Sequence, residues 1–143
     1  MDTITRQSVL DLLSGDWADY VPHFQSLSPV ARAAFLQQQG YKCLVDLLAH
    51  IVAWWEYGMQ AIPRYHSDPA ARLAEIDVNS FNARAVAQVH GVSESEEIRV
   101  FEEARHKFID LTRQLPDEDF MDERILTQYK WELVGHLEEH RIK

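Results

Sequence analysis

Apolar residues recur along this chain at intervals of three and four, which is the spacing of a helix, and no segment alternates convincingly with the period of two that a strand requires. The first apolar stripe consists of Leu10, Leu13, Trp17, Tyr20, Val21 and Phe24. We expect Pro22 to kink or end this first helix. Ser28 is then a suitable N-cap with Pro29 at the first helical position, which predicts a short helix before Gly40.

The most apolar part of the chain is residues 41–62, where a broad hydrophobic face predicts a central helix. That face comprises Leu44, Leu47, Leu48, Ile51, Trp54 and Trp55. We expect Pro63 to mark the end of this helix, and the weak pattern of residues 63–77 predicts a crossover. Asp77 is suited to cap a short helix that Gly91 interrupts.

Two further long helices are predicted after this crossover. Ser93 and Glu96 form a capping-box pattern at the start of a helix over residues 93–115, and residues 115–120 predict a turn. The last helix runs to the end of the chain through Ile125, Tyr129, Leu133, Val134 and Leu137. The pattern therefore predicts an all-α fold, a four-helix bundle that forms a single domain over residues 1–143.

The long connection determines the expected topology of the bundle. The second long helix would span roughly 33 Å at 1.5 Å per residue, and the residues from Pro63 to Val92 can return that distance. The third long helix can then run parallel to the second, which is a down-up-up-down arrangement with a long crossover between helices 2 and 3. The last helix would run antiparallel to the second, so that His136 and His140 lie level with His50.

Composition narrows the possible partners and the compartment. The net charge of −9 opposes binding to nucleic acid or to an anionic membrane, because no basic patch is available to neutralise phosphates. The longest apolar stretch is too short to span a membrane, and the first residues do not read as a signal peptide. The single cysteine, Cys43, excludes an internal disulfide. We therefore expect a cytoplasmic protein.

Histidines are the candidate chemistry. His136 and His140 stand four apart in the last helix and therefore share a face, and His50 from the facing helix can complete a triad. Three neutral imidazoles with an open position suit Zn²⁺, Ni²⁺ or Fe²⁺. The alternative for the pair is a solvated helix end with incidental histidines, and the alternative for His50 is an ordinary core residue.

Four polar residues are candidates for supporting roles around these histidines. Asp46 and Glu132 precede His50 and His136 by one turn, so either carboxylate can orient a ligand imidazole or belong to a solvated acidic face. Asn79 and Asn82 either reach a substrate at the mouth of the site or decorate the short helix after Asp77. The tryptophans either line an apolar pocket or fill the core.

Several segments together carry a family resemblance. LLAHIVAWWE around His50, DVNSFNARAV, SESEEIRVFEEARHKFIDLTRQLPDEDF and the closing VGHLEEH follow one another in an order that resembles the DinB/YfiT-like superfamily of four-helix-bundle metalloenzymes. The ClbS/DfsB-like group is the most similar. The resemblance covers most of the chain from about Tyr41 onward. It implies a down-up-up-down bundle and a divalent metal held by His50, His136 and His140.

The same resemblance implies an activity. Relatives include thiol-dependent transferases and isomerases that use bacillithiol or mycothiol, and a hydrolase that opens an electrophilic cyclopropane ring. We therefore expect a metal-dependent enzyme that acts on a small electrophilic molecule by hydrolysis or thiol transfer, in detoxification or self-protection. A low-molecular-weight thiol is then a possible cosubstrate. The alternative is a non-catalytic bundle that binds a ligand or partner and keeps a structural metal. A homodimer is also expected.

Overall fold

The computed structural model describes residues 3–142, and all its regular elements are helical. The longer elements are α1 (Arg6–Ser14), α2 (Asp16–Ser26), α3 (Pro29–Gln39), α4 (Leu44–Ser67), α5 (Val78–Gln88) and α6 (Glu94–Gln114). They are followed by the 3₁₀ helix η1 (Asp117–Met121), then α7 (Glu123–Tyr129), the π-helical turn η2 (Lys130–Gly135) and α8 (His136–His140). The prediction of an all-α chain is therefore confirmed for the described residues.

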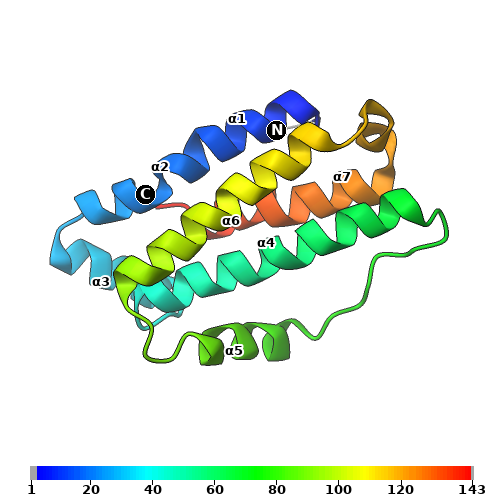
Figure 1. Ribbon diagram of the computed structural model, residues 1–143. Coiled ribbons are helices and arrows are strands. Elements are labelled where there is room, and N and C mark those ends of the chain that lie inside the picture. The colour runs from blue at the N-terminus through cyan, green and yellow to red at the C-terminus, as the bar shows by residue number, and fades with distance from the viewer. Residues whose placement is uncertain (1–2, 143) are drawn as a thin grey trace.

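Helix α4 lies at the centre of the arrangement and packs against α5, α6 and α7. In Figure 1, α4 and α6 run in the same direction along the molecule, whereas α1 and α2 on one side and α7 on another run back. Helix α5 and the irregular segment before it lie along the side of α4 that α6 leaves open. The C-terminal segment therefore passes beside the N-terminal half of α4.

Aromatic side chains from several helices form the centre of one core. The largest fully buried side chains include Trp17, Trp55, Tyr65, Tyr129, Phe101 and Phe108. The rings of Trp17 and Trp55 meet edge to face with centroids 4.9 Å apart. Burial of such rings supplies the main favourable free energy of folding, at about 25 cal/mol for each Å² of apolar surface. The sequence left the tryptophans between pocket and core, and Trp17 and Trp55 are core residues.

Both prolines that were expected to interrupt helices lie inside them. Helix α2 continues past Pro22, so of the kink or end expected there the end is wrong, and α4 continues past Pro63 to Ser67, so the end predicted at Pro63 is wrong. An interior proline costs about 3 kcal/mol, but the fully buried Ile62 and Tyr65 anchor the helix on either side of Pro63. The first helix breaks instead at Gly15, whose φ of −106° and ψ of −96° are not helical.

The predicted caps are present. Ser28 accepts a hydrogen bond from the Ala31 N–H, Asp77 from Ser80, and Ser93 from Glu96. Helix α3 ends at Gly40 in the left-handed conformation, with φ of 83°, which glycine adopts without steric cost. These local signals determine where α3, α5 and α6 begin.

The last helix contains a π-helical turn that the sequence pattern did not predict. In this turn the Glu132 carbonyl accepts the indole N–H of Trp55 at 3.0 Å, and the Leu133 carbonyl accepts that of Trp17 at 3.1 Å. Two core tryptophans thereby donate hydrogen bonds to backbone carbonyls of the π-helical turn. Such turns are rare and often occur at functional sites. The turn ends at Gly135, directly before His136.

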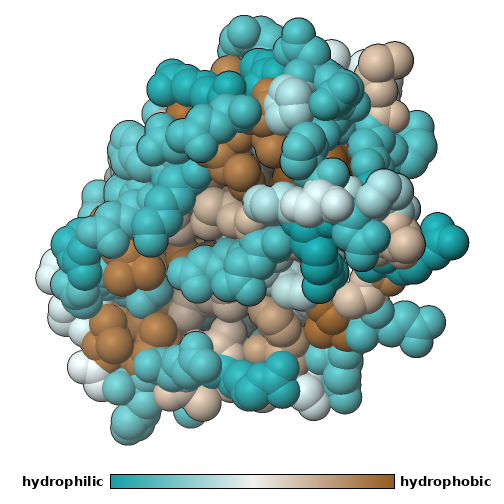
Figure 2. Space-filling view, turned by 45° about the vertical axis from the view of Figure 1, so that its right-hand side comes forward, coloured by the Kyte–Doolittle hydropathy of each residue, from teal (hydrophilic) through white to brown (hydrophobic). Residues whose placement is uncertain are grey.

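Hydrophilic residues cover most of the face in Figure 2, and hydrophobic residues are seen there in separate groups. Exposed large hydrophobic residues include Val30, Val78, Met121 and Trp131. None of the helices among the described residues is long and apolar enough to cross a membrane.

Candidate metal centre

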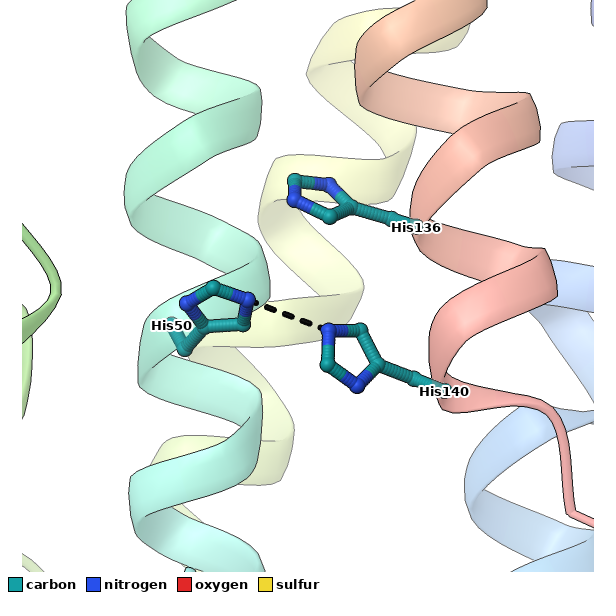
Figure 3. A group of neighbouring side chains, drawn as sticks. All are labelled: His50, His136 and His140. Carbon is teal, nitrogen blue, oxygen red and sulfur yellow. Dashed lines mark hydrogen bonds between the residues drawn. The ribbon is translucent and has the colours of Figure 1, made fainter. Parts of the chain in front are cut away.

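Three histidines from two helices meet inside the molecule. His50 comes from α4, and His136 and His140 come from α8, with all three rings turned toward one another (Figure 3). One ring nitrogen from each histidine lies within 4.8 Å of the other two, and Nε2 of His50 is 3.1 Å from Nε2 of His140. The side chains are buried, with 5–8% of their surface exposed. The structure therefore brings together the three residues that the sequence singled out.

The position of the proton on His50 follows from its neighbours. Oδ1 of Asn82 lies 2.9 Å from Nδ1 of His50 and accepts the indole N–H of Trp54 at 2.7 Å. Because an indole nitrogen can only donate, the shared atom of Asn82 must be its oxygen. Nδ1 of His50 must then carry the proton, and Nε2 presents a free lone pair.

The other two imidazoles are held in the same way. Nδ1 of His136 donates to the backbone carbonyl of Glu132 at 3.0 Å, which cannot be reversed because a carbonyl only accepts. Nδ1 of His140 lies 2.6 Å from Oε1 of Gln39, at the end of α3, and donates to it in the tautomer that leaves Nε2 free. In that tautomer all three Nδ1–H groups are engaged by oxygen and three Nε2 lone pairs are directed into one space. In the other tautomer Nε2 of His140 donates to Nε2 of His50 at 3.1 Å, which is the contact drawn in Figure 3.

The electrostatics favour neutral rings. Burial lowers the pKa of His50, lowers that of His136 to about 4 and lowers that of His140 to about 3, with the neighbouring imidazoles adding to the effect on the last two. A neutral imidazole whose Nδ1 carries the proton presents its Nε2 lone pair to a cation. The set therefore fits Zn²⁺, Ni²⁺ or Fe²⁺, each of which accepts imidazole ligands and can keep a position for water or substrate.

A cavity of about 440 Å³ opens beside the histidines. Its walls come from α4, from the segment before α5, from α5 and from the last helix. The lining residues are His50, Trp54, Tyr57, Ala74, Ile76, Val78, Asn82, Gln128, Trp131, Glu132, Gly135, His136 and Glu139. Volumes of this order are typical of small-molecule sites. Trp54 and Trp131, which the sequence left between pocket and core, therefore line the pocket.

Glu132 is the polar residue at the base of this cavity. Only 2% of its surface is exposed, and burial raises the pKa of its carboxyl to about 8, although the hydrogen bond from Gln128 opposes this. The sequence suggested that the Glu132 carboxylate could orient His136. The structure shows that the backbone carbonyl of Glu132 does so instead. Oε2 of Glu132 accepts the Gln128 amide N–H at 2.5 Å, and Tyr65 holds Gln128 from the other side at 3.0 Å.

The other predicted supporting residues separate clearly. Asn82 contacts the site, but as the partner of His50, whereas Asn79 is exposed and does not line the cavity. Asp46 is half-buried and lies on a different groove, so it does not orient His50. Gln39 was not predicted, because no spacing along the sequence relates it to the histidines. Only the folded chain brings Gln39 next to His140.

Comparison of the chain with models of protein families, with curated proteins and with solved structures finds no match. The class of protein is therefore inferred from the geometry of the histidines and the cavity beside them.

Proposed function

We propose that this protein is a divalent-metal-dependent enzyme that acts on a small electrophilic molecule. The observation that carries the proposal is the geometry of the three rings: the Nδ1 atom of each faces an oxygen, and one ring nitrogen of each lies within 4.8 Å of the other two. Partners of this kind fix the tautomer and orientation of metal-binding histidines. A cavity beside the cluster provides the place for a substrate.

The chain's own residues have distinct tasks in this proposal. His50, His136 and His140 hold the metal, and Asn82, Gln39 and the Glu132 carbonyl keep their Nδ1 protons away from it. A bound divalent ion polarises an electrophile or lowers the pKa of a bound water or thiol toward neutrality. The cavity walls orient the substrate against the Nε2 face and limit the access of bulk water.

The directions of the helices also support a family assignment. We assign the chain to the down-up-up-down four-helix bundles, because α4 and α6 run in one direction and α1, α2 and α7 in the other (Figure 1). The resemblance to the DinB/YfiT-like superfamily, and to its ClbS/DfsB-like group, is part of this proposal. Detoxification or self-protection in the cytoplasm is the role that it implies.

Hydrolysis is the reaction we favour over thiol transfer. Among the cavity residues that the structure describes there is no lysine or arginine, while two are glutamates, Glu132 and Glu139. A thiol cosubstrate that carries carboxylates would therefore find no counter-charge on the walls. Water meets no such obstacle.

Metal content and turnover test the proposal together. We expect the purified chain, after reconstitution, to hold close to one Zn²⁺, Ni²⁺ or Fe²⁺, measured by elemental analysis, and His136→Ala to lose it. His106→Ala, which changes an exposed histidine of α6, is the matched control and should keep the metal. Turnover of an epoxide and cyclopropane panel, with water alone and with added thiol, should require the metal. No metal in the reconstituted wild type would refute the proposal.

A structural metal in a non-catalytic bundle is the competing function, because the site joins α3, α4 and α8 through Gln39 and the histidines. A structural metal contributes directly to folding free energy. His136→Ala that unfolds at ordinary temperature, with no turnover in wild type on the whole panel, would favour this alternative. A folded variant that has lost metal-dependent turnover would favour the enzyme.

A further inference from the structure

The walls of the cavity are aromatic and aliphatic, and they carry two carboxyls. Trp54, Tyr57 and Trp131 contribute rings, Ile76 and Val78 contribute aliphatic groups, and the lining residues include no lysine or arginine. Trp131 and Val78 are about half exposed, at 51% and 52%, so they form the rim of the opening. Such walls favour a flat apolar body and disfavour an anion, whose desolvation they do not offset.

Glu132 has one carboxyl oxygen that a ligand in the cavity can contact. Its Oε2 is engaged by Gln128, and Oε1 has no hydrogen-bond partner among residues 3–142. The side chain itself is 2% exposed and lines the cavity, so this oxygen faces the enclosed space rather than bulk water. Water in the cavity can reach this oxygen, and a ligand N–H that replaces the water can donate to it.

Helix α4 is shaped to leave room for this carboxyl. A Cβ atom placed on Gly58 would lie 2.7 Å from Cγ and 3.1 Å from Oε2 of Glu132. A glycine inside a helix is about 1 kcal/mol less favourable than alanine. The close approach of Glu132 gives the physical reason for glycine at this place, and it fixes where the carboxyl lies.

We propose that the cavity takes a substrate with a flat, mainly apolar body that carries an amine or amide N–H, which donates to Glu132, and no carboxylate or phosphate on that body. The proposal rests on the proposed function only in calling this ligand a substrate. The N–H end lies against Glu132, the ring lies between the aromatic walls, and the reactive end points toward the three Nε2 atoms. An ammonium gains further from the faces of Trp54 and Trp131.

Matched indole probes test the charge and donor preference in the metal-free full-length chain. Tryptamine is a cation with N–H donors on the side chain, indole-3-acetamide is neutral with an amide N–H, and indole-3-acetate is an anion without a side-chain donor. We expect the first two to bind at least about tenfold more tightly than the acetate, measured by NMR titration. Equal or tighter binding of the acetate overturns the proposal.

Two glutamine variants locate the preference. In Glu132→Gln the advantage of tryptamine over the acetate should fall by about fivefold or more. Glu139→Gln makes the same replacement at a residue whose side chain is 70% exposed, so it should change the advantage by less than about twofold. A larger effect of Glu139→Gln than of Glu132→Gln assigns the recognition to general surface charge and overturns the proposal. Trp131→Ala should weaken all three probes alike.

The test is independent of the metal. If the chain prefers tryptamine and indole-3-acetamide over the acetate but binds no metal after reconstitution, the inference about the cavity stands and the proposed metal-dependent activity is refuted. Normal metal binding with no preference among the probes would keep the enzyme and remove the cavity inference.

Discussion

The hydrogen bonds of Asn82 show how one amide can prepare a ligand. The oxygen accepts from Trp54 and from His50 at the same time, so the donor-only indole fixes the amide and the amide fixes the imidazole. The contact is made by a residue of α5, a helix that packs against α4. Asn82 is therefore a positioning residue for the proposed metal centre.

Replacing Asn82 should weaken metal binding without removing a ligand. We expect Asn82→Ala to lower the affinity for Zn²⁺ by about 10- to 100-fold, because His50 loses the acceptor that holds its Nδ1 proton. Asn79→Ala, on the same helix but exposed, is the matched control and should stay within about twofold. Competition with a chromophoric chelator measures both. Equal affinities in the two variants would show that the amide does not position the ring.

At the scale of elements, α4 and the last helix approach each other closely at Gly58. A Cβ atom there would overlap the buried Glu132 side chain, whereas one on Gly135 would meet its nearest neighbour, the Lys130 carbonyl, at 3.5 Å. Both glycines lie within helical segments. Alanine at either position gains the same helix propensity, but only alanine at position 58 meets a steric clash. Comparison of the two variants therefore isolates the steric cost.

We expect Gly58→Ala to destabilise the fold by about 1–2 kcal/mol, because overpacking costs more than the propensity gained. Gly135→Ala should be neutral or stabilising, because its Cβ makes an ordinary contact. Urea denaturation of both variants measures the difference. Stabilisation by Gly58→Ala would mean that Glu132 moves freely and that α4 does not fix its place.

Helix α6 carries a second buried carboxyl, Glu97, at 3% exposure. It faces α4 and α5 across a lining of alanine and valine, and burial, followed by the charges of Glu56 and Glu96, raises its pKa to about 7. A folded pKa above the unfolded value of 4.5 means that the folded state holds the proton more tightly. Stability from this group is therefore present below about pH 4.5 and is lost as the pH rises through about 7.

Denaturation at pH 5 and pH 8 tests this sign. From pH 5 to pH 8 the stability of the wild type should fall relative to that of Glu97→Gln by about 1 kcal/mol or more, because the amide of the variant does not ionise. The comparison removes the opposite contribution of the buried histidines, which is the same in both chains. Glu103→Gln, at an exposed position of the same helix, controls for net charge and should follow the wild type. A parallel pH dependence in all three chains would contradict the assignment to Glu97.

At the scale of the whole molecule, the antiparallel passage of the last helix beside α4 assembles the site from residues far apart in the sequence. His50 and His140 are brought to 3.1 Å between their Nε2 atoms. The cavity is closed on its other side by the crossover and α5. Ligand cluster and cavity therefore depend on the same packing.

We predict a homodimer in solution, because the surface keeps large exposed hydrophobic side chains that pairing can cover. Val30 and Met121, at 80% and 83% exposure, are of the kind that an interface buries. Light scattering at high concentration should give twice the chain mass. A monomer mass throughout the concentration range would contradict this prediction.

Local signals account for much that could be predicted. Apolar spacing predicts the helices, and the side chains of Ser28, Asp77 and Ser93 cap α3, α5 and α6 as expected, because a cap acts within one turn. The pairing of His136 with His140 follows from their spacing alone. Pro22 and Pro63 were misread because tertiary burial outweighs a local helix penalty.

The sequence by itself determined the helical class, the caps and the three histidines, since these depend on periodicity and on residue type. Only the tertiary structure decided that Gln39 and Asn82 hold two of the imidazoles, that a carbonyl rather than the Glu132 carboxylate holds the third, and that Gly58 makes room for that carboxylate. Each of these contacts joins different parts of the fold or depends on a π-helical turn that core tryptophans stabilise. Such contacts form by packing across the molecule, and no periodic pattern along the chain encodes them.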